Sequence, residues 1–179
     1  MTDRIRFDGV LIVGAGLAGL SAALAMAPRK ALLLSPEPLS KACSSAWAQG
    51  GLAAALSADD TPELHARDTE AAGAGLVEFD AVRRLTEAAA DTVRRLAELG
   101  APFDRDAEGR FVQSLEAAHS RPRVARVGGD RAGLAITISM VEAVRRAAHV
   151  EVMEGGRLRA LLQDETGRVR GALSSATNA

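Results

Sequence analysis

Cysteine, histidine and aromatic residues are scarce in this sequence, and each shortage excludes a kind of function. Cys43 is the only cysteine among 179 residues, which rules out an internal disulfide and a zinc site built on several thiolates. The histidines His65, His119 and His149 lack the close spacing of helical metal ligands, so we expect no metal, and His149 is expected to be structural. Aromatic residues make up only 3%, too few for binding single-stranded nucleic acid by base stacking.

Neither an excess of charge nor a long apolar run is present. The 22 basic and 23 acidic side chains leave a net charge of -1, which does not favour nucleic acid or an anionic membrane as a partner. The N-terminus has no apolar signal core, and no apolar run approaches the ~18 residues that span a bilayer. We therefore predict a cytoplasmic protein with no membrane and no nucleic-acid partner.

What the sequence does contain is a glycine-rich loop between an apolar run and a helix-forming segment. Val10–Val13 is typical of a parallel strand buried on both faces, and Gly14, Gly16 and Gly19 follow it as G-x-G-x-x-G. We expect Gly14 to allow the turn, Gly16 to let a pyrophosphate approach, and Gly19 to let the helix pack on the strand. The phosphates would lie at the N-terminus of a helix over 17–27, where free N–H groups and the helix dipole favour anions.

A second apolar run, over 31–34, completes a β-α-β unit. This context favours dinucleotide binding over a purely structural glycine turn. One part of the usual site is missing. A carboxylate that binds ribose commonly ends the second strand, but Ser35 stands there and Glu37 follows two residues later.

The segment 43–55 has an unusual composition, with the only tryptophan, two adjacent serines and a Gln-Gly-Gly sequence. It is too apolar for an exposed loop and too rich in glycine for a stable helix. Ser44, Ser45 and Gln49 offer hydrogen bonds, while Gly50 and Gly51 would let backbone N–H groups approach a flat ligand. The alternative is a buried turn followed by a short helix.

Three further helices are predicted. One begins at Asp60-Thr-Pro62 and ends at Gly73. The next runs over Glu78–Leu99 with arginines on its solvated side, and its expected buried positions are Val82, Leu85, Ala89, Val93, Leu96 and Leu99. The last runs over about Ala132–Ala147 after a cap at Asp130, and its expected buried positions are Leu134, Ile136, Ile138, Val141 and Val144.

The remaining segments predict strands. Val150–Met153 would lie beside the second strand, giving the local order 3-2-1. Arg157–Gln163 and Arg168–Leu173 are typical of an antiparallel hairpin, and Phe103–Phe111 of a turn between short strands. We therefore predict an α/β fold, a Rossmann-like partial parallel sheet with an antiparallel β-hairpin added.

A second unusual segment, 114–130, is irregular and polar and contains glycine. Its charged and histidine residues are Glu116, His119, Arg121, Arg123, Arg126 and Asp130. Such segments often carry binding residues, and the alternative is a plain exposed loop.

Taken in order, these motifs resemble those of the L-aspartate oxidase family, within the succinate dehydrogenase and fumarate reductase flavoprotein superfamily. They are the glycine loop, Ser44-Ser-Ala-Trp-Ala-Gln-Gly-Gly51, Asp68-Thr-Glu-Ala-Ala-Gly-Ala-Gly75, and Glu116-Ala-Ala-His-Ser120 with Gly128-Gly-Asp-Arg-Ala-Gly133. The likeness covers about residues 7–172. The glycine loop is common to many flavoproteins, whereas the second and fourth motifs together are specific to this family.

The resemblance implies FAD as the cofactor, with its pyrophosphate on the glycine loop, its ribose near Ser35 and its isoalloxazine against the serine-tryptophan segment. The implied contacts are Gly14, Ala15, Gly16, Leu17, Ala18, Gly19, Ser35, Ser44, Ser45, Ala46, Trp47, Ala48, Gln49, Gly50 and Gly51. In the respiratory relatives a histidine joined covalently to the flavin occupies the place of Ser44. Serine cannot make that bond, so the resemblance implies non-covalent FAD.

The reaction implied by the resemblance is oxidation of L-aspartate to iminoaspartate. Hydride would pass from Cα to the flavin, with oxygen or fumarate as the electron acceptor, in the first step of de novo NAD biosynthesis through quinolinate. Quinolinate synthase is the implied protein partner. Glu116 is implied to orient the substrate by facing its amine, and a carboxylate there favours a substrate that carries nitrogen over succinate.

Chains of this family are much longer, so we expect residues 1–179 to be the N-terminal part of the FAD-binding domain. The capping and C-terminal helical domains, the proton-donor arginine and the histidines that bind substrate carboxylates would lie outside it, and the fragment would not turn over alone. An open sheet edge beside the first strand predicts self-association. Two alternatives are a fumarate reductase or succinate dehydrogenase-like flavoprotein, disfavoured by Ser44 and Glu116, and a non-catalytic nucleotide-binding module.

Overall fold

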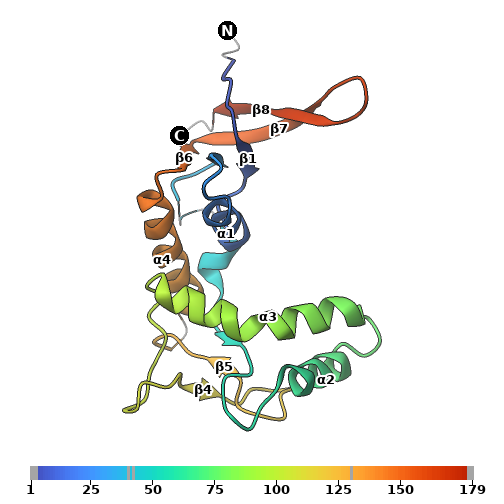
Figure 1. The fold of residues 1–179 in the computed structure, drawn as a ribbon, viewed down its shortest axis with the longest axis vertical. Helices are drawn as coiled ribbons and strands as arrows, with labels where there is room; N and C mark the ends of the chain where they lie inside the picture. Colours follow the sequence, from blue (N-terminus) through green and yellow to red (C-terminus); the bar gives the residue numbers. More distant parts are fainter. Residues whose placement is uncertain (1–3, 40, 42, 130, 177–179) are drawn as a thin grey trace. The chain divides into compact units, whose positions relative to one another are not determined.

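The computed structural model describes residues 4–39, 41, 43–129 and 131–176, so the expected helix cap at Asp130 lies outside the described residues. The chain forms two compact units (Figure 1). The first consists of Met1–Ala46 and Thr137–Ala179, and the second of Trp47–Ile136.

A parallel three-stranded sheet forms the centre of the first unit. Its strands are β1 (Val10–Val13), β2 (Ala31–Ser35) and β6 (Val150–Glu154), in the order β1-β2-β6. This confirms the predicted local order 3-2-1. Ala31 of the central strand lies opposite both Val10 and Val150.

The burial of β1 differs from the prediction. Leu11 and Val13 are 38% and 42% exposed, whereas Leu33 and Leu34 of β2 are buried. The expectation of a first strand buried on both faces is therefore wrong. Leu11 and Val13 are two positions apart and share one face of the sheet, and β1 is an edge strand of the described sheet, so this face is covered less in β1 than in β2.

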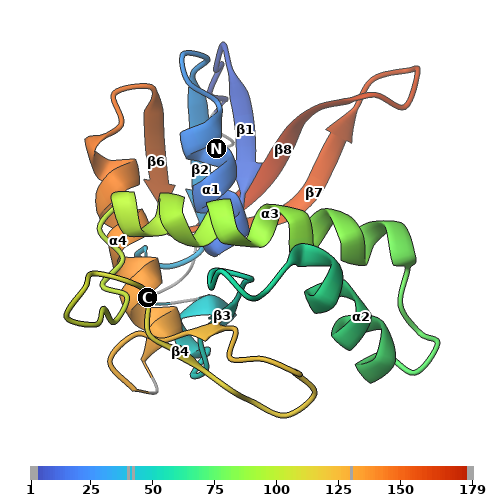
Figure 2. The same ribbon diagram turned by 60° about the horizontal axis from the view of Figure 1, so that its bottom comes forward.

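Helix α1 (Leu17–Ala25) packs against β1 and β2, as Figure 2 shows. Its alanine and leucine residues favour a helix, and Leu20 and Ala23 have no exposed surface. His149 Nε2 lies 3.0 Å from the Ala23 carbonyl oxygen. The structural role predicted for this histidine is therefore confirmed, since its ring joins the end of α1 to the residue before β6.

An antiparallel hairpin, β7 (Gly156–Gln163) and β8 (Val169–Ala176), follows β6. Its turn is closed by Asp164 Oδ1, which accepts from the Thr166 and Arg168 backbone N–H groups at 3.0 and 3.1 Å. Gly167 takes a φ of +80° in this turn. The predicted hairpin is confirmed.

Two helices, α2 (Pro62–Ala72) and α3 (Phe79–Glu98), pack together in the second unit. Thr61 caps α2, with its Oγ1 accepting from the Leu64 N–H at 3.2 Å. The arginines of α3 are exposed as predicted; they are Arg83, Arg84, Arg94 and Arg95. The buried residues of α3 are Val82, Thr86, Val93 and Leu96.

Leu85 of α3 departs from the predicted pattern. It was expected to be buried but is 71% exposed. The reason is that Leu85 lines an open apolar groove, whose other walls are residues of α2 and α3 and the pair Leu52 and Ala53. It therefore lies at the border of the buried face of α3.

A small antiparallel sheet completes the second unit. It is formed by β3 (Leu52–Ala53), β5 (Val124–Ala125) and β4 (Gln113–Ser114), in the order β3-β5-β4. This sheet was not predicted, because strands of two residues carry no readable period. Nearby, Arg105 pairs with Phe111 in an antiparallel bridge, which confirms the turn expected over 103–111.

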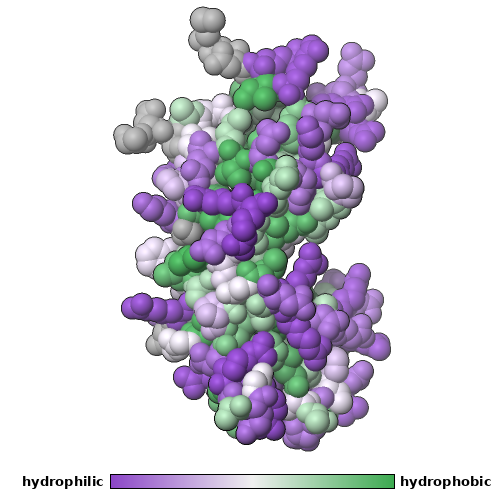
Figure 3. Space-filling view, turned by 60° about the vertical axis from the view of Figure 1, so that its left-hand side comes forward, coloured by the Kyte–Doolittle hydropathy of each residue, from purple (hydrophilic) through white to green (hydrophobic). Residues whose placement is uncertain are grey.

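Helix α4 (Ala132–Arg146) agrees with its predicted range. Ile136, Met140 and Val144 form a buried stripe at a spacing of four, but Leu134 and Ile138 are 40% and 44% exposed. Their predicted burial is wrong because they lie two positions from the stripe, on the other side of the helix. Figure 3 shows hydrophobic residues on the surface among hydrophilic ones. No helix in the described ranges is both long enough and apolar enough to cross a bilayer.

Candidate functional site

The glycine loop lies at the carboxyl end of β1, between the strand and α1. Gly14 has a φ of +104°, which L-residues with side chains rarely adopt, and its N–H donates to the Leu34 carbonyl at 2.9 Å. The first glycine therefore allows the turn, as predicted.

Gly19 and Gly16 are glycines for different reasons. A β-carbon on Gly19 would collide with the Gly14 carbonyl oxygen, so close packing of α1 on the loop requires glycine there. A β-carbon on Gly16 would lie 3.4 Å from Ser45 Oγ, an ordinary contact, and the φ of Gly16 is -76°. The described residues thus leave room for a side chain at Gly16.

The N-terminus of α1 is suited to an anion. Its first turn has no acidic side chain, and the positive end of the helix dipole points into the loop. The Leu17 N–H donates to Ser45 Oγ at 3.3 Å, which places the serine segment against the glycine loop. This combination fits the phosphate-binding part of a dinucleotide site.

The serine segment forms a short 3₁₀ helix, Ser44–Trp47. Trp47 is 80% exposed, and residues 47–50 are all exposed, so the expectation that this stretch would not be an exposed loop is wrong. One turn of 3₁₀ helix is too short to bury both of its sides. Ser45 and Ala46 are the half-covered residues.

Gly50 and Gly51, predicted together as ligand contacts, lie in different surroundings. A β-carbon on Gly50 would meet no atom within 4 Å. A β-carbon on Gly51 would collide with the Ala125 carbonyl oxygen of β5. Packing against β5 therefore explains Gly51, while Gly50 is open to solvent.

Ser35 ends β2 and is buried, with 3% of its surface exposed. Its hydroxyl donates to the Glu37 carbonyl at 2.6 Å, and the Glu37 side chain is exposed. The serine hydroxyl still has acceptor capacity, but its proton is used within the loop.

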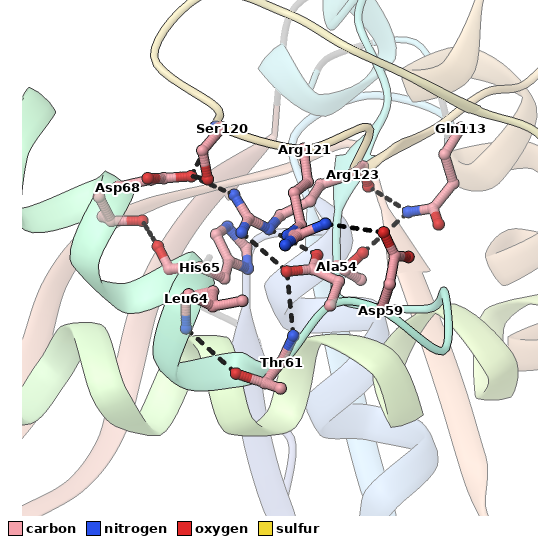
Figure 4. A network of polar contacts seen from close by, with 12 residues as sticks. Ala54, Asp59, Thr61, Leu64, His65, Asp68, Gln113, Ser120, Arg121 and Arg123 are labelled. Atoms are coloured by element: carbon pink, nitrogen blue, oxygen red, sulfur yellow. Dashed lines mark hydrogen bonds and ion pairs between the residues drawn. The ribbon is translucent and has the colours of Figure 1, made fainter.

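The guanidinium of Arg123, in the second unit, has no exposed surface. Its Nε and Nη2 donate to both carboxylate oxygens of Asp60 at 2.6 and 2.8 Å, and its Nη1 donates to Asp68 (Figure 4). Burial of the charge is the largest single effect and lowers the pKa of Arg123, but the hydrogen bonds that Arg123 donates to Asp60 and Asp68, with the charges of these carboxylates, together outweigh it and raise that pKa. The alternative of a plain exposed loop is therefore wrong for this part of the segment.

Glu116 lies at the start of a tight turn in this segment and is exposed. The His119 N–H donates to the Glu116 carbonyl at 3.2 Å, and Ala118 has a φ of +69°. Ser114 Oγ donates to Glu116 Oε1 at 3.4 Å. The carboxylate is thus available to a ligand.

Two histidines that are 54 positions apart in the sequence lie together beside this network. The ring centroids of His65 and His119 are 5.5 Å apart, and the Nδ1 atom of each is buried without a hydrogen-bond partner among the described residues. Burial, then the charge of Arg123, lowers the pKa of His65. No group of three potential metal ligands occurs in the described part of the chain.

Sequence reasoning missed the roles of Asp60, Asp68 and Arg123. One signal was present, because Arg123 directly precedes the apolar pair Val124-Ala125, and a basic residue beside a buried strand needs acidic partners. Nothing in the spacing identifies those partners.

The β-α-β unit and its loop define a dinucleotide-binding α/β domain. The sequence model of a family described as the FAD binding domain matches residues 9–178. The chain belongs to this family, and FAD is its cofactor.

Curated relatives point to one enzyme within the family. The chain is 59% identical to an L-aspartate oxidase of Caulobacter vibrioides over 98% of its own length and 35% of the relative's. It is 44% identical to an L-aspartate oxidase of Streptomyces coelicolor over 90% of the chain and 28% of the relative. The chain thus spans about a third of the length of the curated relatives it matches.

Solved structures share the fold. An E. coli quinol fumarate reductase superimposes with a TM-score of 0.85 at 26% identity, over 94% of this chain and 29% of that one. The Mycobacterium smegmatis Sdh1 complex gives a TM-score of 0.84 at 28% identity, over 94% of this chain and 31% of the other.

Proposed function

We propose that this chain provides the N-terminal part of the FAD-binding domain of an L-aspartate oxidase, which converts L-aspartate to iminoaspartate with oxygen or fumarate as the electron acceptor. The observation that carries the proposal is the 59% identity to a protein with that name over nearly the whole chain. This reaction would be the first step of NAD biosynthesis through quinolinate.

The first unit would hold the pyrophosphate of FAD. Gly16 leaves the approach open, and the positive end of the α1 dipole lies at the loop with no acidic side chain in the first turn. Ser44, exposed beside this loop, has no nucleophilic ring nitrogen, so we propose that FAD is held without a covalent bond. When bound, FAD supplies the acceptor for the hydride that leaves Cα.

Glu116 would bind the substrate amine. Its exposed carboxylate is free to form a charge-assisted hydrogen bond with an ammonium group, which succinate and fumarate lack. The residue therefore selects an amino acid over a plain dicarboxylate.

A fumarate reductase-like enzyme is the second candidate, favoured by the likeness to the E. coli structure. Its lower identity of 26%, together with Glu116 and Ser44, makes it the weaker candidate. A non-catalytic nucleotide-binding module is the third.

The decisive experiment measures hydrogen peroxide formation from L-aspartate by the complete product of the reading frame, loaded with FAD. Glu116→Gln should lower kcat/KM for aspartate because a charged hydrogen bond to the substrate is lost. The expected loss of transition-state stabilisation is about 1.5–3 kcal/mol. Fumarate reduction should fall less. Glu87→Gln, at an exposed position of α3, is the matched control and should leave both reactions unchanged.

The outcomes separate the three candidates. Fumarate reduction without aspartate oxidation by the unaltered protein would favour the second. FAD binding without either reaction would favour the third. An equal loss of both reactions in Glu116→Gln would contradict the recognition of the amine.

We also propose a cytoplasmic location for the protein, an association with quinolinate synthase, and self-association through the edge of β1. Cell fractionation tests the first. Co-purification tests the second, and sedimentation at several concentrations tests the third.

A further inference from the structure

One carboxylate oxygen of α2 holds the far end of the turn that carries Glu116, beside the Ser114 hydroxyl on the Glu116 carboxylate and the His65 ring next to His119. Asp68 Oδ2, on α2, accepts from the Ser120 N–H and from the Ser120 hydroxyl, both at 2.7 Å (Figure 4). The same oxygen accepts from Arg123. The two bonds from Ser120, followed by Arg123, hold the pKa of the Asp68 carboxyl well below its usual range, so it is ionised at neutral pH.

The turn itself is poorly held by its own contacts. One backbone hydrogen bond, from the His119 N–H to the Glu116 carbonyl, closes it at 3.2 Å. Ala118 lies in the left-handed region, which is unfavourable for alanine. A turn of this kind keeps one conformation only when neighbouring structure fixes it.

Asp68 can fix the turn because it also binds Arg123, which belongs to the buried part of the second unit. Arg123 is clamped by both oxygens of Asp60, and both side chains have no exposed surface. The side chain of Asp68 is 19% exposed and stands between this fixed guanidinium and the exposed turn. Ser120 follows Glu116 by four residues, so its position sets the direction of the intervening backbone.

We propose that Asp68 is a positioning residue, which fixes the turn over Glu116–Ser120 and thereby aims the Glu116 carboxylate at the substrate amine. The role of Glu116 in this statement rests on the proposed function. The anchoring of the turn is a separate claim that can be measured without activity.

The test uses Asp68→Asn in the complete FAD-loaded protein. Arg123 keeps its bidentate partner Asp60, so the variant should fold and hold FAD like the unaltered protein. We expect kcat/KM for aspartate to fall roughly 10- to 100-fold through misplacement of Glu116. Fumarate reduction, which involves no amine, should change by less than about 3-fold, whereas general structural damage would lower both reactions.

The matched control is Asp59→Asn. Asp59 also pairs with an arginine of the same segment, Arg121, at 2.7 Å, but this pair is exposed and should contribute little. In a double-mutant cycle, Asp68→Asn should have little further effect in Glu116→Gln, because both changes act through the same carboxylate. Additive losses would overturn the positioning role.

A readout of backbone exchange separates this proposal from the proposed function. Amide hydrogen exchange of the peptide containing Ser120 should accelerate in Asp68→Asn and in Ser120→Ala, and stay near normal in Ser120→Thr, which keeps the hydroxyl. If the unaltered protein does not oxidise aspartate, the proposed function fails while this measurement still decides the anchor. Unchanged exchange in Asp68→Asn overturns the proposal.

Discussion

The carbonyl oxygen of Gly14 stands where a β-carbon on Gly19 would have to be. Close packing between Gly14 and Gly19 therefore requires glycine at position 19 even without a ligand. A β-carbon at Gly16 would take no part in this contact. Because the three positions carry different constraints, their substitutions should have different consequences.

Gly19→Ala should destabilise the fold in the absence of FAD. The added methyl group collides with backbone rather than with a flexible side chain, so we expect a loss of about 1–3 kcal/mol in the free energy of unfolding. Urea denaturation monitored by circular dichroism measures it. Gly16→Ala is the control and should stay within about 0.5 kcal/mol of the unaltered protein. Equal losses in the two variants would contradict the assignment.

Gly16→Ala should instead weaken FAD binding. The protein has room for the methyl group, but the bound pyrophosphate would approach the same place, so we expect Kd for FAD to rise by about tenfold or more. Quenching of flavin fluorescence during titration gives Kd. Ser21→Ala, at an exposed position of α1, should bind FAD normally. Normal affinity in Gly16→Ala would show that the pyrophosphate lies elsewhere.

The cofactor should be released when the protein is denatured. Ser44 stands where the covalently flavinylated relatives have a histidine, and serine offers no ring nitrogen for the bond. Acid precipitation of the yellow protein should leave the colour in the supernatant, as absorbance shows. Colour that stays in the washed pellet would contradict this prediction.

Breaking the pair between Asp60 and Arg123 should be costly. Asp60→Asn leaves a buried guanidinium with much weaker compensation, and we expect a loss of about 3–5 kcal/mol in the free energy of unfolding. Asp91→Asn, which removes an exposed pair with Arg94 on α3, should cost less than about 1 kcal/mol. Similar midpoints in urea for the two variants would argue against a buried charge network.

Stability should decrease on acidification below about pH 6.5 because of His65. Its pKa is 6.5 in an ordinary environment and lower in the folded protein, mainly through burial. Between these two pKa values the unfolded chain binds a proton that the folded chain does not. The free energy of unfolding therefore decreases as the pH is lowered, by at most about 1.4 kcal/mol per pH unit for this group.

Urea denaturation between pH 5 and pH 8 measures this dependence. His65→Leu should flatten the profile over the range from pH 6.5 downward, because the residue that takes up the proton in the unfolded chain is gone. A slope in His65→Leu equal to that of the unaltered protein would assign the effect to other groups.

The local pattern of the sequence determined the β-α-β unit, the glycine loop, the long helices and the C-terminal hairpin. Each of these leaves a mark in a short stretch of sequence: a period in α3, a cap at Thr61, a glycine with a positive φ at Gly14. The resemblance in the motifs also led to the right family, which the match over residues 9–178 confirmed. The roles of the individual site residues stay predictions.

Only the tertiary structure decided which apolar residues are buried and which charges meet. Leu85 fits the helical period of α3 but is exposed, since burial depends on what packs against a face and not on the face alone. Asp68 and Arg123 are 55 positions apart, and no local rule relates them. The helices and the hairpin could be predicted because their hydrogen bonds join residues close in the chain, and the β-α-β unit because its apolar runs and glycine spacing form a recognisable pattern. The anchor of the Glu116 turn needed the fold, because it joins a helix to a loop across a long stretch of chain.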